Sequence, residues 1–178
     1  LTAQLADFVV GMAERPVPDD AAAIVRTGFI DTIATMLAGR DEPVVGIVRG
    51  FVAAQAGPAG PEHRARVLLG GETARARDAA LINGTAGHAL DYDDVALAGH
   101  PSTVLVPTVI AMAEQTGASG IDALRAYLAG YEVWAELIAR DPDSHHLKGW
   151  HPTAVFGTVA SAAAAALLLR YDRALTQR

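Results

Sequence analysis

Apolar residues recur at spacings of three and four along most of this chain, and this spacing favours helices over strands. The pattern is clear in Leu5, Phe8, Val9 and Met12, and it returns in each long segment that follows. Prolines and glycines divide it, because proline disfavours a helical residue before it and glycine often ends a helix. The predicted helices are 2–14, 19–39, 43–55, 73–90, 102–116, 119–140 and 152–169, with the start of another at 171–178.

The predicted fold class is therefore all-α, with six to eight helices and at most one short strand, at 66–70. We expect residues 1–178 to form a single helical domain, since 178 residues are enough to bury a core. The segment 56–64 is a loop by composition. Many alanines would let the helix axes approach closely. The Asn83–Gly84 pair inside the fourth predicted helix indicates either a kink or close packing.

Composition excludes several classes of function. The formal net charge of -6 and the absence of a lysine- or arginine-rich run argue against nucleic acid as a partner. The chain contains no cysteine, which rules out a thiol nucleophile, a disulfide, cysteine-ligated zinc and a cysteine-held iron–sulfur cluster within it. The uncharged run 152–169 contains Gly157 and Ser161, so we expect a buried helix rather than a membrane span. A cytoplasmic protein without a membrane partner is the expectation.

Two polar clusters stand out from this apolar background. Residues 83–102 contain two histidines and three aspartates, and 145–151 contain His145, His146, Lys148 and His151. Burying carboxylates and imidazoles costs free energy, so their concentration indicates a function. We predict that the two clusters form one site for an anionic substrate at the ends of helices. His63 and His145 are expected at the surface, and the histidines of the second cluster do not match a standard metal-binding spacing.

Two tripeptides, His100-Pro101-Ser102 and His151-Pro152-Thr153, each precede a predicted helix. Proline is favoured at the first helical position, which places each histidine at the cap and each hydroxyl in the first turn. The free N–H groups and the helix dipole favour anions there, and the same field disfavours a charged imidazole. Each histidine could then accept or relay a proton, although ordinary polar caps would give the same pattern.

The aspartates form the run Asp91-Tyr92-Asp93-Asp94. Three ionised carboxylates this close repel one another, so they need cations, hydrogen bonds or a raised pKa. One could act as a general acid or base and another could orient an imidazole, although a solvated loop is the simpler interpretation of the run alone. His88, three residues before Asp91, could share a helix face with it. Lys148 could hold a substrate carboxylate.

Together, the motifs NGTAGHALDYDD, HPS, GYEVWAEL and KGWHPTAVFGTVASAAAAALLL resemble the MmgE/PrpD family along essentially the whole chain. This family includes 2-methylcitrate dehydratase, cis-aconitate decarboxylase and an iminodisuccinate epimerase. The resemblance implies a helical domain, homodimers and metal-free, cofactor-independent chemistry on small di- and tricarboxylates. It also implies an active-site aspartate at Asp91 and histidines at His100 and His151.

Family members are usually more than twice this long and carry a second α+β domain, so the chain is expected to be their N-terminal part. A lysine and a histidine that the family supplies later have no counterpart here. Val95 stands where a threonine is expected, and the loop to His100 is a residue shorter. Both differences leave the particular substrate open.

The function predicted from the sequence is a metal-independent lyase for a small di- or tricarboxylate such as 2-methylcitrate, an acid of propionate metabolism. Asp91, His100 and His151 would be catalytic, and the substrate would be bound by His88, Asp94, Ser102, Lys148 and Thr153. One alternative is an epimerase of the same family, and another is a catalytically incomplete module that binds carboxylates or dimerises. The aspartate run also resembles motifs of terpenoid cyclases, which often need magnesium.

Overall fold

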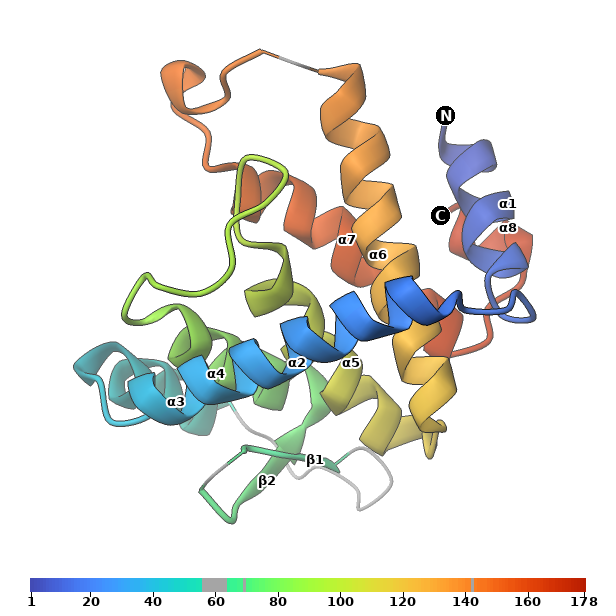
Figure 1. Cartoon of the computed structure of the whole chain (residues 1–178). Coiled ribbons are helices and arrows are strands. Elements are labelled where there is room, and N and C mark those ends of the chain that lie inside the picture. The colour runs from blue at the N-terminus through green and yellow to red at the C-terminus, as the bar shows by residue number, and fades with distance from the viewer. Residues whose placement is uncertain (56–63, 69, 142) are drawn as a thin grey trace.

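The computed structural model describes residues 1–55, 64–68, 70–141 and 143–178, and within these the chain forms eight α-helices (Figure 1). The all-α prediction is confirmed, whereas the predicted loop at 56–64 and His63 lie almost wholly outside the described residues. The helices are α1 (Thr2–Gly11), α2 (Asp19–Gly39), α3 (Pro43–Gln55), α4 (Ala76–His88), α5 (Pro101–Thr116), α6 (Gly120–Arg140), α7 (Pro152–Leu168) and α8 (Arg173–Thr176).

Local sequence signals set most helix ends. Prolines open α3, α5 and α7 at the first helical position, where a missing N–H costs nothing. The predicted capping box is present at α6, where the Ser119 hydroxyl accepts from the Asp122 N–H and the Asp122 carboxylate accepts from the Ser119 N–H. Gly117 ends α5 in the left-handed conformation. Two ends differ from prediction by three residues, since α1 stops at Gly11 rather than 14 and α4 starts at Ala76 rather than 73.

A small ribbon takes the place of the predicted strand at 66–70. Strands β1 (Arg64–Arg66) and β2 (Thr73–Arg75) pair antiparallel, so residues 73–75 are not the start of a helix. Distant side chains hold it: Glu114 accepts from the Arg66 N–H at 2.6 Å, and the buried Asn83 bonds the Leu68 N–H and the Arg66 carbonyl. Contacts between residues so far apart produce no periodic pattern in the sequence, so the ribbon could not be predicted from spacing.

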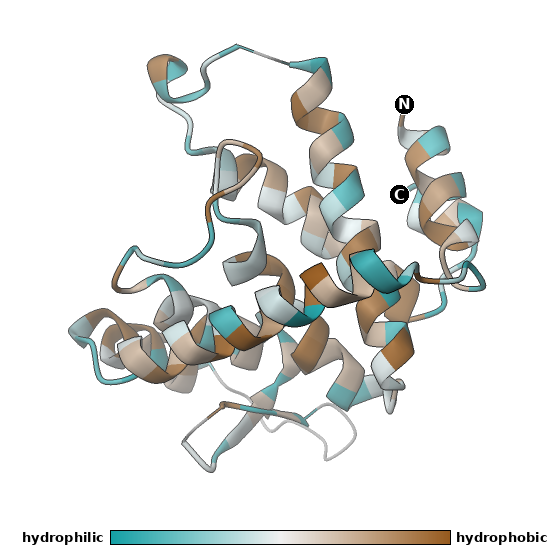
Figure 2. Ribbon diagram, viewed as in Figure 1, coloured by the Kyte–Doolittle hydropathy of each residue, from teal (hydrophilic) through white to brown (hydrophobic). Residues whose placement is uncertain are grey.

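Helix α5 lies at the centre of the molecule and packs against α4, α6, α7 and α2 (Figure 1). Its Leu105, Val106 and Val109 are fully buried, as is Trp134 of α6. Figure 2 shows apolar colour on these central helices and hydrophilic colour on much of the chain that leaves α4. The uncharged segment that opens at Pro152 is the largely buried helix that the sequence predicts.

Glycines let these helices approach closely. A Cβ on Gly39 would lie 2.2 Å from the Ala86 carbonyl oxygen, and one on Gly130 would lie 2.5 Å from Leu105 Cδ2 and 2.7 Å from the Ala160 carbonyl oxygen. Gly84 and Gly87 likewise face the first turn of α5, so the Asn83–Gly84 pair marks close packing rather than a kink. The end of α4 is thereby held against the start of α5.

Helix α2 has a segment of mean hydropathy 1.4, of which 28% is buried. By length and composition it is the one helix in the described part of the chain that could cross a membrane, a property that buried helices of soluble proteins share. The expectation of no membrane partner therefore remains a prediction.

We predict that Gly130→Ala lowers the free energy of unfolding by about 1–3 kcal/mol, because its Cβ overpacks the contact of α6 with α5 and α7. Gly46→Ala is the matched control: it also lies inside a helix but has open space around its Cβ. This control should stabilise the protein by up to about 1 kcal/mol through helix propensity. Urea denaturation measures both, and equal effects would contradict the packing argument.

Candidate active site

The connections from α4 to α5 and from α6 to α7 lie at the same end of the molecule (Figure 1). His100 is the N-cap of α5 and His151 is the N-cap of α7, and each is followed by proline at the first helical position, as the sequence predicts. Neither imidazole bonds the N–H groups of its own helix. Both rings are therefore available for other contacts.

Four histidines from the two predicted clusters come together here. The ring centres of His88 and His100 are 4.6 Å apart, those of His88 and His151 6.4 Å, and those of His146 and His151 5.6 Å. His88 is the last residue of α4, and His146 begins the 3₁₀ turn η2 (His146–Lys148). The structure thus joins sequence segments about fifty residues apart into one cluster.

Asp93 is the buried carboxylate of this cluster, and its side chain is 0% exposed. Its two oxygens lie 2.9 Å and 3.2 Å from His88 Nδ1, and Oδ2 lies 3.4 Å from His100 Nδ1. An ionised carboxylate can only accept a hydrogen bond, so with Asp93 ionised this contact requires the tautomer of His88 that carries a proton on Nδ1. The His100 contact has ion-pair distance without hydrogen-bond geometry, and Nδ1 of that ring has no hydrogen-bond partner in the described part of the chain.

Asp93 was not among the site residues predicted from the sequence. One aspartate of the run was expected to orient an imidazole, but Asp91 and Asp94 were the ones predicted as site residues. The three aspartates follow α4 in a loop without helical or strand periodicity, so spacing gives no sign of which one is buried. The only local sign that Asp93 contacts a histidine is its position five residues after His88.

Asp91 has the opposite environment. Its side chain is 79% exposed, and its backbone adopts a φ of 54°, which is uncommon for residues other than glycine. One carboxylate oxygen lies 3.8 Å from His100 Nε2. The His100 ring therefore has a buried carboxylate near one nitrogen and an exposed carboxylate near the other.

Asp94 and Ser102, both predicted to bind substrate, bind each other. Asp94 accepts from the Ser102 N–H at 3.1 Å and from the Ser102 hydroxyl at 2.7 Å, and Tyr127 of α6 lies 2.7 Å from that hydroxyl. Burial raises the pKa of Asp94, against the lowering effect of its bonds to Ser102, and burial raises the pKa of Tyr127 to about 12. Because Ser102 is only 1% exposed, we assign this network to fixing the start of α5, beside His100.

Thr153, the third predicted binding residue, also holds His100 in place. Its hydroxyl oxygen accepts from the His100 backbone N–H at 3.1 Å. The preceding turn has Leu97 and Ala98 at positive φ, and the Trp134 indole N–H donates to the Leu97 carbonyl at 3.2 Å. Gly99 packs so tightly against Thr153 and Trp134 that a Cβ would lie within 3 Å of both. Helices α6 and α7 therefore fix the backbone that carries His100.

The segment between α6 and α7 corrects one expectation and weakens another. His145 was expected at the surface, but it is 7% exposed, lies 3.1 Å from Asp141 and meets the Phe156 ring edge-on. The Lys148 ammonium lies 2.7 Å from Asp143 and 3.8 Å from Asp141. The hydrogen bond to Asp143 raises the pKa of Lys148. These neighbours offset the charge that was expected to hold a substrate.

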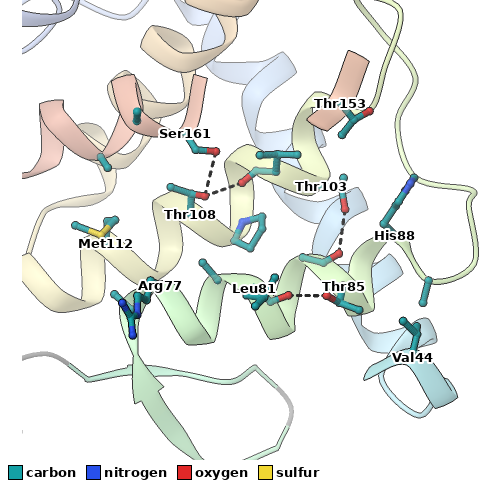
Figure 3. Close-up of a pocket in the computed structure, with 18 residues that line it drawn as sticks. Val44, Arg77, Leu81, Thr85, His88, Thr103, Thr108, Met112, Thr153 and Ser161 are labelled. Carbon is teal, nitrogen blue, oxygen red and sulfur yellow. Dashed lines mark hydrogen bonds between the residues drawn. The ribbon is translucent and has the colours of Figure 1, made fainter. Parts of the chain in front are cut away.

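A groove of about 860 Å³ runs between α4, α5 and α7 and reaches the cluster at His88 and Thr153 (Figure 3). Its lining is mostly apolar and includes Val44, Leu81 and Met112, with Arg77 near the far end. This groove adjoins the histidines rather than enclosing them. We locate the candidate active site at the charged cluster, because that is where the proton-transfer groups lie.

Comparison with known proteins settles the family. The model of the MmgE/PrpD N-terminal domain matches residues 3–178. The chain belongs to the MmgE/PrpD family. The resemblance inferred from the sequence motifs is thereby confirmed.

Three curated proteins are similar in sequence to this chain. The cis-aconitate decarboxylases of Homo sapiens and Mus musculus are 39% and 38% identical over 97 residues, 51% of this chain and 20% of each relative. The cis-aconitate decarboxylase-like protein oryM of Aspergillus oryzae is 30% identical over 186 residues, 95% of this chain and 36% of that protein. The chain thus spans well under half the length of these relatives.

We predict that Asp93→Asn changes the tautomers of the site histidines, because the amide no longer offers a charged acceptor to His88 Nδ1. In nitrogen-15 NMR spectra of the imidazoles at neutral pH, the fraction of His88 protonated on Nδ1 should fall. Asp41→Asn, at an exposed residue paired with Arg40, is the control and should leave the ring signals unchanged. Unchanged His88 signals in Asp93→Asn would contradict the assignment.

Proposed function

We propose that this MmgE/PrpD chain carries the acid–base half of a lyase site for a small di- or tricarboxylate, with a dehydratase acting on a 2-methylcitrate-like acid as the leading candidate. The observation that supports this most is that His100 and His151 both lie beside His88, with the buried Asp93 in contact with His88 and His100. We further propose that the chemistry is metal-independent and needs no cofactor, in keeping with a set of groups that can move protons by themselves.

The reaction needs one group to take a proton and another to give one. In a dehydration, a base removes the proton from the carbon next to a carboxylate, the C–O bond breaks, and an acid protonates the departing hydroxyl to give water. In a decarboxylation, the bond to the departing carbon dioxide breaks, and an acid protonates the carbon that retains the electron pair. The dehydration thus uses imidazoles in two positions around one substrate, whereas the decarboxylation step uses one of them as an acid.

His100 and His151 suit these two tasks because their surroundings differ. His100 is largely buried between Asp91 and Asp93, whereas His151 is exposed at the start of α7. In this proposal Asp93 fixes His88 and faces Nδ1 of His100, which leaves Nε2 of His100 for the substrate and for Asp91. A neighbouring carboxylate stabilises the positive charge that an imidazole gains when it accepts a proton. Asp91, which is exposed and lies next to Nε2, relays a proton or orients the His100 ring.

The positive end of α7 supports recognition of an anion. This helix has 17 residues, and its first turn lies beside the cluster. Pro152 has no N–H and the Ala154 N–H donates to the His151 carbonyl, so the Thr153 N–H and the helix dipole are what favour a carboxylate at this end. The start of α5 is less available, since the Ser102 N–H already donates to Asp94. We therefore place the non-reacting carboxylate of the substrate near His151 and the start of α7.

The second candidate function is binding of a carboxylate without turnover. The exposure of the site favours it, because Asp91 and His151 both face solvent and acid–base sites generally work best when water is excluded. An epimerase, in which two bases act on opposite faces of one carbon, would use the same pair of histidines. The products formed separate these reactions.

We also propose that the protein works as a cytoplasmic homodimer. Several apolar side chains of α2 and α3 are exposed, namely Ile24, Ile30, Ile47 and Phe51. Exposed apolar side chains in such number are compatible with a protein–protein contact. Sedimentation velocity should give a dimer that Ile30→Glu shifts to monomer, with exposed Leu147→Glu on η2 as the control. A monomeric wild-type protein would contradict this proposal.

We predict that the protein converts at least one of 2-methylcitrate, citrate and cis-aconitate in the presence of a chelator, followed by proton NMR. His100→Gln and His151→Gln should each lower kcat by about 100- to 10,000-fold, the usual contribution of a general acid or base. Glu136→Gln, at an exposed residue paired with Arg140, should leave kcat unchanged.

Near-normal kcat in both histidine variants would contradict the acid–base assignment, and loss of activity with the chelator would contradict metal independence. Binding of one of these acids without conversion, weakened in the His151 variant, would support the binding function instead.

A further inference from the structure

The cluster that contains the proposed acid and base is also arranged to hold a metal ion. His88, Asp91, Asp93 and His100 each offer one nitrogen or oxygen atom, and these four atoms all lie within 4.8 Å of one another. They come from the end of α4, the loop that follows it and the N-cap of α5. Two imidazoles and two carboxylates make a complete set of ligands for a four-coordinate ion.

The charges of the cluster favour a cation. Asp93 is fully buried, and its recorded ion-pair partners are His88 and His100. Among the described ion pairs, none joins Asp91 or Asp93 to a lysine or arginine. A buried carboxylate needs a compensating charge, and a bound cation would supply one. The substrate of the proposed reaction is itself an anion, which adds negative charge rather than cancelling it.

One buried polar atom of the cluster, beside Asp93, lacks a hydrogen bond to the described residues. His100 Nδ1 is inaccessible to solvent and makes no hydrogen bond to any described residue. A buried polar atom in this state costs free energy, and native structures satisfy nearly all such atoms. Its position, 3.4 Å from Asp93 Oδ2, matches the separation of about 3.3–3.6 Å between two ligands that bind one zinc ion at about 2.0–2.2 Å.

We propose that His88, Asp91, Asp93 and His100 bind one Zn²⁺ ion, and that the bound ion inhibits the protein by occupying the groups that transfer protons. The mixed nitrogen and oxygen ligands select zinc or a similar transition metal over magnesium or calcium, which prefer oxygen alone. Asp91 must move inward to complete the site, and its exposed side chain is free to do so. Binding stands on the geometry alone, and only the inhibition rests on the proposed function.

Direct binding is tested with the metal alone. Zinc titrated into the protein against a chromophoric chelator should bind with one equivalent at micromolar concentration, and Co²⁺ should give the intense visible absorption of a four-coordinate site. His88→Gln and Asp93→Asn should each weaken zinc binding roughly tenfold or more. Asp41→Asn is the aspartate control, and His145→Gln is the histidine control because His145 contacts Asp141 and Phe156 outside the cluster.

Circular dichroism confirms that each variant is folded before it is titrated. Absence of zinc binding in the wild-type protein would overturn the site. Equal binding in the wild-type protein and in both cluster variants would also overturn it, because the ion would then be held elsewhere. Neither result depends on turnover, so the outcome is independent of the proposed reaction.

Inhibition is tested in the turnover assay. Zinc should lower the rate in competition with the carboxylate, and a chelator should restore it. Zinc that binds the cluster but leaves turnover unchanged would overturn the inhibitory role and separate the cluster from the reaction. Turnover that requires zinc would overturn both the inhibitory role and the metal-independent mechanism.

Discussion

The contact of one buried carboxylate, that of Asp93, with two imidazoles is the interaction on which the site depends. Removing a carboxylate from water is costly, and the cost is offset only when its oxygens are fully engaged. His88 supplies a hydrogen bond from the end of α4, and His100 supplies a close contact from the start of α5. The two helix ends therefore have to stay within a few ångströms of each other for the site to exist.

The fold meets this requirement through small residues. The absence of a side chain at Gly39 lets the end of α4 pack closely against α2. Gly84 and Gly87 likewise let the start of α5 pack closely against α4. On the other side of His100, Gly99 lets the turn pack against Trp134 and Thr153. Ser102 then joins α5 to Asp94 and to Tyr127 of α6. The residues predicted to touch substrate are in large part those that hold the histidines in position.

Local patterns predicted the features of the chain that are themselves local. Apolar spacing gave the helices, and the two His-Pro motifs gave the N-cap positions of His100 and His151. The burial of Asp93 and of His145 depends on partners brought in by other helices, so neither could be found from spacing. The predicted position of the strand, 66–70, was wrong for the same reason. The ribbon formed by β1 and β2 is held by Asn83 of α4 and Glu114 of α5, which are distant in the sequence.

A double-mutant cycle between Asp93 and His100 tests most directly whether the buried carboxylate and the imidazole act as one unit. The kcat/KM of Asp93→Asn, His100→Gln and the double variant would be compared with that of the wild-type protein for the best carboxylate substrate. Residues that act together give strongly non-additive losses, so the double variant should be hardly worse than His100→Gln. Losses that simply add in free energy would show that Asp93 acts independently of His100 and would contradict the account.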